Sequence, residues 1–75
     1  MYEIILKNGK KALITPNDIW LAEHLAMDLR STEIAKIGKI NKRTLEGRLD
    51  KLRLKCGCNT LWGALFILYQ NRIIK

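Results

Sequence analysis

The sequence has few of the residues that build metal centres, disulfide frameworks or catalytic triads. Its 75 residues include two cysteines and one histidine. Cys56 and Cys58 have no second cysteine pair or local histidine that would complete a tetrahedral zinc set. We therefore expect them to be small buried side chains at a helix end in a reducing compartment. His24 has no partner placed for a metal site or triad, so we expect it to be a packing residue and predict no metal and no cofactor.

Long apolar runs are also absent. The longest stretch without a charged residue, 56–71, has 16 residues and includes Asn59, Thr60 and Gln70. It is too short and too polar at its ends to span a bilayer. The chain begins with an apolar segment followed by a basic one, the reverse of a secretory signal. We expect a cytoplasmic protein without a membrane partner. No phosphate-binding loop, supported Ser-His-Asp order or carboxylate pair is present, so an enzyme is not predicted.

Negative charge is scarce. Seven Asp and Glu face 14 Lys and Arg, and the formal net charge is +7. The segment 36–55 holds eight of the basic residues and only Glu46 and Asp50 on the acidic side, a net charge of +6. An excess of lysine can serve solubility alone. The concentration of positive charge in one segment instead favours an anionic partner, and nucleic acid is the first candidate.

The N-terminal 15 residues are predicted to form a β-hairpin. Two β-prone runs, 2–6 and 10–15, flank Lys7-Asn8-Gly9-Lys10. Asn-Gly between such runs is typical of a two-residue type I′ turn. A lone hairpin is marginal in water, so its apolar face needs a helix to lie on. The candidates for that face are Ile4, Leu6 and Leu13.

A first helix is predicted from residue 16 to about residue 27. Thr15 can be the N-cap, Pro16 the first helical residue, and Asp18 lies where it favours the exposed N–H groups. The predicted core stripe is Leu21, Ala22, Leu25 and Leu29. A second stripe, which could hold the hairpin, is Ile19, Trp20, His24 and Met27.

Two further helices form the basic segment. Ser31 is the expected cap of a short helix, 32–38, with Ile34, Ala35 and a further candidate, Ile37, facing inward. Asn41 is the expected cap of a longer helix, 42 to about 56. Its apolar residues Leu45, Leu49, Leu52 and Cys56 repeat at helical spacing. A short helix, a tight connection and a longer basic helix are the layout of a helix-turn-helix.

A fourth helix is predicted from residue 61 to about residue 71, after Gly57 as a left-handed helix end and Asn59 or Thr60 as cap. It is apolar on two sides. One stripe is Leu61, Leu65 and Leu68, with Ala64 beside it. The other, Trp62, Phe66, Tyr69 and Ile73, exceeds what a small domain buries alone. It is the predicted dimer interface, and the alternative is that the hairpin covers it.

The central segment resembles the LuxR/FixJ/GerE-type helix-turn-helix family. The residues that carry the likeness are Glu33-Ile34-Ala35, Ile40, Arg43-Thr44-Leu45, Lys55 and Gly57, with Thr15-Pro16, Asp18, Leu21, Leu25-Ala26 and Arg72-Ile73-Ile74 outside this core. The match runs without a gap from residue 14 to residue 74. It implies a mainly α fold: a four-helix DNA-binding domain, 16–75, preceded by the hairpin, 1–15, in one compact unit. Because only about fifteen residues precede the match, we expect a stand-alone unit without a sensor domain.

By this resemblance the third helix enters the major groove and the fourth forms a two-fold dimer contact. Arg43 and Thr44 would contact phosphates or base edges, Arg48 takes the place of a frequent histidine, and Lys55 that of a phosphate-side lysine. The predicted DNA-binding residues are Lys42, Arg43, Thr44, Glu46, Gly47, Arg48, Lys51 and Lys55. The alternative for Lys42, Arg43, Arg48 and Lys51 is a solvated face.

Four positions depart from the family pattern: Gly38-Lys39, Glu46, Gly47 and Cys56. Glu46 replaces a usual lysine, and it can accept a hydrogen bond from cytosine N4 or repel the phosphate backbone. The function we expect is a transcriptional regulator that binds double-stranded DNA as a homodimer. The alternative is a protein-interaction module that pairs with another regulator or RNA polymerase and does not read DNA.

Overall fold

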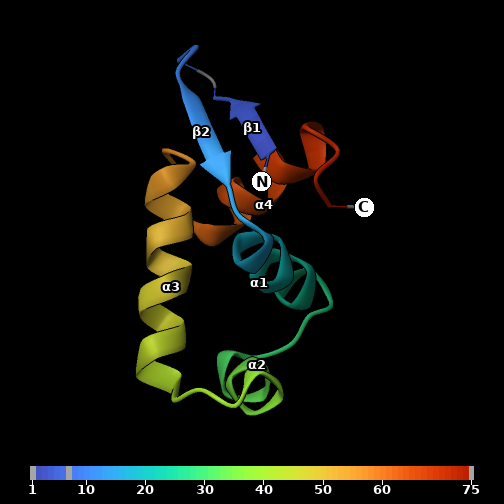
Figure 1. Ribbon diagram of the computed structural model, residues 1–75, viewed down its shortest axis with the longest axis vertical. Helices are drawn as coiled ribbons and strands as arrows, with labels where there is room; N and C mark the ends of the chain where they lie inside the picture. Colours follow the sequence, from blue (N-terminus) through green and yellow to red (C-terminus); the bar gives the residue numbers. More distant parts are fainter. Residues whose placement is uncertain (1, 7, 75) are drawn as a thin grey trace.

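The chain folds as four helices preceded by a two-stranded antiparallel hairpin (Figure 1). The computed structural model describes residues 2–6 and 8–74; Met1 and Lys75, the outer ends of the two predicted regions, lie outside this range, as does Lys7. The elements are β1 (Tyr2–Ile5), β2 (Lys11–Ile14), α1 (Pro16–Ala26), α2 (Ser31–Gly38), α3 (Lys42–Lys55) and α4 (Leu61–Gln70). The mainly helical fold class and the N-terminal hairpin predicted from the sequence are confirmed.

The hairpin turn differs from the predicted type I′ turn. Ile5 pairs with Lys11, and the Leu6 N–H donates to the Lys10 carbonyl at 2.8 Å. The loop therefore has three residues and ends at Gly9, whose φ is +82°. A three-residue loop with a left-handed glycine is the next most common hairpin connection after the two-residue turns. The prediction of a two-residue turn was wrong, because the described hydrogen bond joins Leu6 to Lys10; Lys7 lies outside the described residues.

The hairpin register decides which apolar side chains reach the core. Ile4, Ala12 and Ile14 are buried, Leu6 is partly buried, and Leu13 is 53% exposed. Successive strand residues point to opposite faces, so the burial of Ala12 and Ile14 turns Leu13 outward. Of the three candidates for the packed face, Ile4 and Leu6 therefore pack inward and Leu13 does not.

The start of α1 is the predicted one. The Thr15 hydroxyl accepts a hydrogen bond from the Asp18 N–H at 3.2 Å, and the Asp18 carboxylate accepts one from the Thr15 N–H at 3.0 Å. This reciprocal pair satisfies two backbone donors. Leu21 and Ala22 are buried as predicted. The His24 ring stacks on Trp20 with centroids 4.0 Å apart, which makes it a packing residue.

The start and outer face of α2 differ from the prediction. The helix begins at Ser31, and Arg30 is the N-cap because the Glu33 carboxylate accepts the Arg30 N–H at 3.1 Å. Ser31 is therefore inside the helix. Ile34 and Ala35 are buried, but Ile37 is 53% exposed, since a two-turn helix presents only a narrow stripe to the core.

The caps of α3 and α4 agree with the prediction. The Asn41 side chain accepts the Thr44 N–H at 2.7 Å, and Thr60, rather than Asn59, caps α4 through the Gly63 N–H at 3.2 Å. Gly57 has a φ of +69° after the end of α3, as expected of a left-handed residue there.

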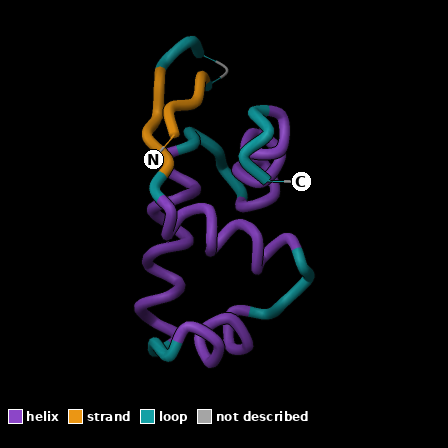
Figure 2. Tube along the Cα trace, turned by 45° about the vertical axis from the view of Figure 1, so that its right-hand side comes forward, coloured by secondary structure: helices purple, strands orange, loops and turns teal. Residues whose placement is uncertain are grey.

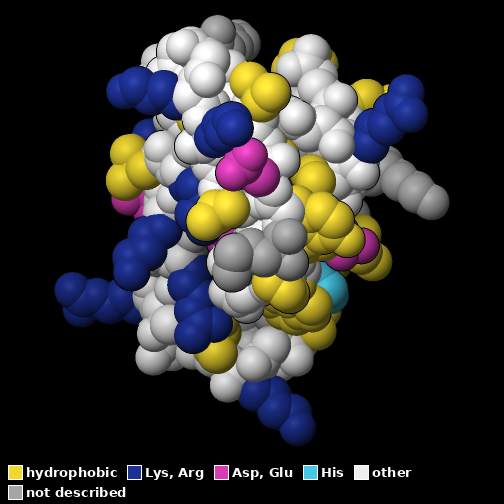
Figure 3. Space-filling view, turned by 45° about the horizontal axis from the view of Figure 1, so that its top comes forward, with side chains coloured by type: hydrophobic (Ala, Val, Ile, Leu, Met, Phe, Trp, Pro, Cys, Tyr) yellow, Lys and Arg dark blue, Asp and Glu magenta, His cyan; other side chains and the backbone are white. Residues whose placement is uncertain are grey.

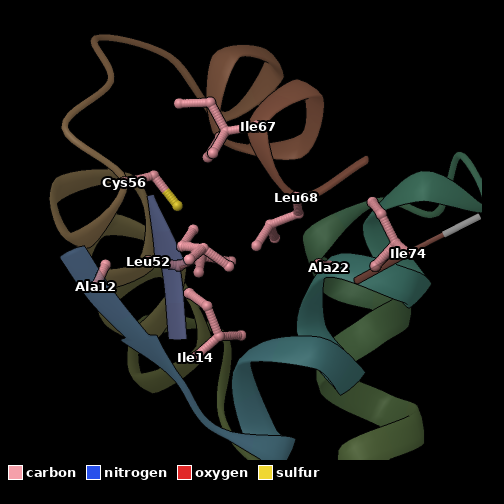
Figure 4. Packing of buried hydrophobic residues seen from close by; sticks show 10 residues of the cluster. Ala12, Ile14, Ala22, Leu52, Cys56, Ile67, Leu68 and Ile74 are labelled. Atoms are coloured by element: carbon pink, nitrogen blue, oxygen red, sulfur yellow. The ribbon is translucent and has the colours of Figure 1, made fainter. Parts of the chain in front are cut away.

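The interior consists of two clusters that meet along α3. The hairpin cluster joins both strands to α4, Ala22 and the C-terminal half of α3 (Figure 4). Its buried members are Ile4, Ala12, Ile14, Ala22, Leu52, Cys56, Ala64, Ile67, Leu68 and Ile74. The α2 cluster joins α1 and α2 to the other half of α3 through Leu21, Ile34, Ala35, Leu45 and Leu49. Figure 2 shows the resulting order along the long axis, with the hairpin at one end and α2 at the other.

Candidate nucleic-acid interface

The outward side of α3 is exposed because the helix gives its apolar side to the core. Leu45, Leu49 and Leu52 are buried, at 0%, 5% and 1% exposure. Seven of the eight predicted DNA-binding residues are exposed: Lys42, Arg43, Thr44, Glu46, Gly47, Arg48 and Lys51. The eighth, Lys55, is partly buried. The 3.6-residue period of the helix therefore brings these residues to the surface as expected.

One flank of this surface is internally neutralised. Lys42 pairs with Glu46 at 3.7 Å, and Arg53 pairs with Asp50 at 2.7 Å. At about 100° per residue, these four residues share one arc of the helix. We call it the paired face: Lys42, Glu46, Asp50 and Arg53. It borders a hollow reaching Ser31 and Thr60. The Glu46 carboxylate is thus drawn to a lysine on its own helix.

The other flank carries cations without such partners. Arg43, Arg48 and Lys51 form no ion pair with a carboxylate within residues 2–6 and 8–74. They lie on a separate arc of α3, which we call the basic face. Arg48 lines a hollow with Pro16 at the start of α1 and Gly38 at the end of α2. This is the part of α3 with the strongest uncompensated positive charge.

Lys55 is tied to α1 instead of standing free in solvent. Its ammonium lies 2.6 Å from the Asp18 carboxylate, and the two side chains are 32% and 12% exposed. Burial raises the pKa of Asp18, but the hydrogen bond from Lys55 and those at Thr15 outweigh it, so the pKa falls below its ordinary value of 3.8. No local sequence pattern predicts this contact, because 37 residues separate the partners.

The turn before α3 adds two exposed cations beside the basic face. Lys36 lies in the last turn of α2, and Lys39 follows that helix with a φ of 55°. A Cβ at Gly38 would lie 3.1 Å from Cη2 of Trp20, so this glycine provides close packing. The left-handed residue is consequently Lys39 and not the glycine. Both lysines were counted in the charge of the segment but not among the predicted site residues.

Three of the four predicted dimer residues lie on α4 and are exposed, whereas Ile73 follows the helix. Trp62, Phe66 and Tyr69 are 80%, 55% and 61% exposed, so the hairpin does not cover them and that alternative was wrong. Ile73 is partly buried against the hairpin cluster. The helix ends at Gln70 and Arg72 has a φ of 60°, which turns the chain away from the helical stripe. The prediction that Ile73 continues the exposed stripe was wrong.

Cys56 and Cys58 are both free thiols, not a disulfide. Cys56 is buried, and Cys58, which is partly exposed, lies 3.5 Å from the Cys56 carbonyl oxygen. Burial, followed by the neighbouring charges of Cys58 and Asp18, raises the pKa of Cys56 to about 11. Within residues 2–6 and 8–74, no group of three or more His, Cys, Asp or Glu side chains is arranged to hold a metal ion.

None of the helices in the described part of the chain has the length and apolar character needed to cross a membrane. No protein-family model matches the sequence, and neither curated proteins nor solved structures gave a match.

Proposed function

We propose that this protein is a transcriptional regulator that binds double-stranded DNA, with α3 in the major groove. The observation that carries the proposal is the basic face: Arg43, Arg48 and Lys51 are exposed on α3 outside its stripe of buried leucines, without a described carboxylate partner. Such cations bind phosphates and release counterions, which gives affinity. The short helix, turn and longer helix formed by α2 and α3 provide the geometry by which a recognition helix enters the groove.

The resemblance to the LuxR/FixJ/GerE-type domains supports the same assignment. It covers α1 to α4 without a gap, and α3 is the helix that would read bases. Thr44, Gly47 and Glu46 lie at or between the two faces of α3 and would be nearest to base edges. Glu46 would accept a hydrogen bond from cytosine N4, while Lys42, 3.7 Å away, offsets its repulsion from phosphates.

The proposal includes a homodimer formed through α4. Leu61–Gln70 contains no charged residue, although the chain carries a net charge of +7. Two such chains repel each other over most of their surfaces and can approach at a neutral face. Trp62, Phe66 and Tyr69 give that face aromatic side chains, which interface cores favour. Both half-sites can be read together if the two α3 helices lie about 34 Å apart.

The test is duplex binding measured against salt concentration. Neutralising three phosphates per protomer predicts a log–log slope of about −2.7 for each protomer, from −0.9 per phosphate. The double variant Arg43→Ala, Arg48→Ala should lose most of the affinity and two thirds of that slope. Lys11→Ala removes one charge from β2, where the ammonium is already paired with Glu3 at 3.4 Å, and should leave binding near wild type. Absence of binding, or binding without salt dependence, would overturn the proposal.

A second candidate is an interaction module that contacts another regulator or RNA polymerase without reading DNA. The paired face favours it, because Lys42–Glu46 and Arg53–Asp50 neutralise half of the helix that would enter the groove. The same double variant separates the two functions. If regulation in cells persists when Arg43 and Arg48 are alanine and the fold is intact, the interaction module is supported.

A further inference from the structure

The β-hairpin is attached to the end of α3 that the proposed function leaves unused. Leu52 and Cys56 of α3 share the hairpin cluster with Ile4, Ala12 and Ile14. Both views of the backbone show the hairpin tip extending beyond the C-terminal end of α3 (Figures 1 and 2). This packing connects the strands of the hairpin to the C-terminal end of α3.

If α3 crosses the major groove instead of lying along it, one of its ends leaves the groove. Its 14 residues make a helix about 21 Å long, whereas the major groove is about 12 Å wide and 8.5 Å deep. Arg43, Arg48 and Lys51 lie in the first ten residues, so this part belongs in the groove. The last turn instead exposes Leu54, at 61%. The C-terminal end would pass over a phosphate backbone, and the hairpin is the element beyond it.

The hairpin tip offers an exposed cation next to a hydrogen-bonded turn. The Asn8 side chain accepts the Lys10 N–H at 3.0 Å, and Gly9 takes the left-handed conformation that closes the loop. Lys10 is exposed and has no ion pair with a carboxylate of residues 2–6 or 8–74, whereas Lys11 is paired with Glu3 at 3.4 Å. Figure 3 shows Lys and Arg side chains gathered along the side of the molecule on which α3 lies, from the hairpin end downward.

We propose that the hairpin tip is a second DNA contact, in which the Lys10 ammonium binds phosphates flanking the segment read by α3. This inference rests on the proposed function, since it requires α3 to be in the groove. The tip would supply affinity without base preference, because phosphate contacts carry no sequence information directly. It would also determine on which side of the DNA segment read by α3 the rest of the protein lies.

The first experiment compares salt slopes of the wild-type protein and the variant Lys10→Ala on one duplex. Loss of one phosphate contact per protomer should reduce the magnitude of the slope by about 0.9 per protomer. Lys11→Ala is the matched control from the same hairpin, because its ammonium is already paired, and it should change the slope by much less. Circular dichroism checks that both variants keep the wild-type fold. An unchanged slope for a folded Lys10→Ala variant overturns the inference.

The second experiment follows backbone amide signals by NMR while the duplex is added to the wild-type chain. The amides of Asn8, Gly9 and Lys10 should shift together with those of Arg43 to Lys51. Shifts confined to α3 would show that DNA binds without the hairpin, and the inference would be wrong while the proposed function stands. Absence of shifts in α3 as well would overturn the proposed function itself.

Discussion

The Asp18 carboxylate lies 2.6 Å from the Lys55 ammonium and also accepts the Thr15 N–H at 3.0 Å. One side chain thus caps α1 and holds the last turn of α3 against it. This contact links the start of α1 to the end of α3, although neither residue belongs to the basic face.

Replacing Asp18 should test how much this contact stabilises the fold. Asp18→Asn removes the charge that Lys55 faces and weakens the α1 cap, so we expect a loss of about 2 kcal/mol in the free energy of unfolding. Urea denaturation at neutral pH measures it. Glu46→Gln, which breaks the exposed pair with Lys42, is the control and should cost at most about 0.5 kcal/mol.

The same variant predicts a dependence on pH. The pKa of Asp18 is lower in the folded chain than its ordinary value of 3.8, so its stabilisation is present above about pH 4 and is lost as the pH falls through the folded-state pKa. The difference in stability between wild type and Asp18→Asn should therefore shrink on acidification. A difference that stays constant from neutral pH down to about pH 2 would contradict this.

Replacing Lys39, the left-handed residue before α3, with glycine should stabilise the fold. Its φ of 55° suits glycine, so Lys39→Gly should raise the free energy of unfolding by about 0.5–1 kcal/mol. Lys39→Ala removes the same charge but keeps a Cβ, and it should show no such gain. Chemical denaturation of the two variants separates backbone relief from charge relief; equal stability would exclude the backbone explanation.

The two thiols should react at different rates. Near pH 7.5, iodoacetamide should modify the partly exposed Cys58, while Cys56, which is 1% exposed and has its pKa raised to about 11, should react only after unfolding. Mass spectrometry of digested protein assigns the label. In Cys58→Ser, modification of the folded chain should nearly disappear, and rapid labelling of Cys56 in that variant would contradict the packing.

The exposed aromatic residues of α4 predict the oligomeric state. Trp62 is 80% exposed in the single chain, so Trp62→Glu should not unfold it but should place two like charges in the proposed dimer interface. Sedimentation should show a dimer for wild type and a monomer for this variant. Tyr2→Glu, at another exposed aromatic residue, is the control and should remain dimeric. A dimer that survives Trp62→Glu uses a different surface.

Local sequence signals predicted most of the secondary structure. Each helix cap depends on residues within a few positions of it, so it can be predicted from the sequence. This holds for the caps at Thr15, Asn41 and Thr60 and for the left-handed Gly57. The hairpin loop was mispredicted because Asn-Gly fits both two-residue and three-residue connections. Only the partner across the strand decides between them.

The candidate site was predictable as a surface but not as a charge pattern. Helical spacing placed Arg43 and Lys51 away from the buried leucines, with Arg48 at the margin of the exposed surface. Helical spacing did not predict the ion pair between Lys55 and Asp18, since tertiary packing brings α1 and α3 together across 37 positions. The partial burial of Ile73 was not predicted either, because the helical period was extended past Gln70, the residue at which α4 ends.

The division of the interior has a consequence for how the chain opens. Leu45 and Leu49 of α3 belong to one cluster, whereas Leu52 and the C-cap residue Cys56 belong to the other, so the strands pack against only one half of the helix. Fluctuations that release the strands and α4 would leave the amides near Leu45 protected by α1 and α2. Native-state hydrogen exchange should therefore resolve two cooperative units that share α3.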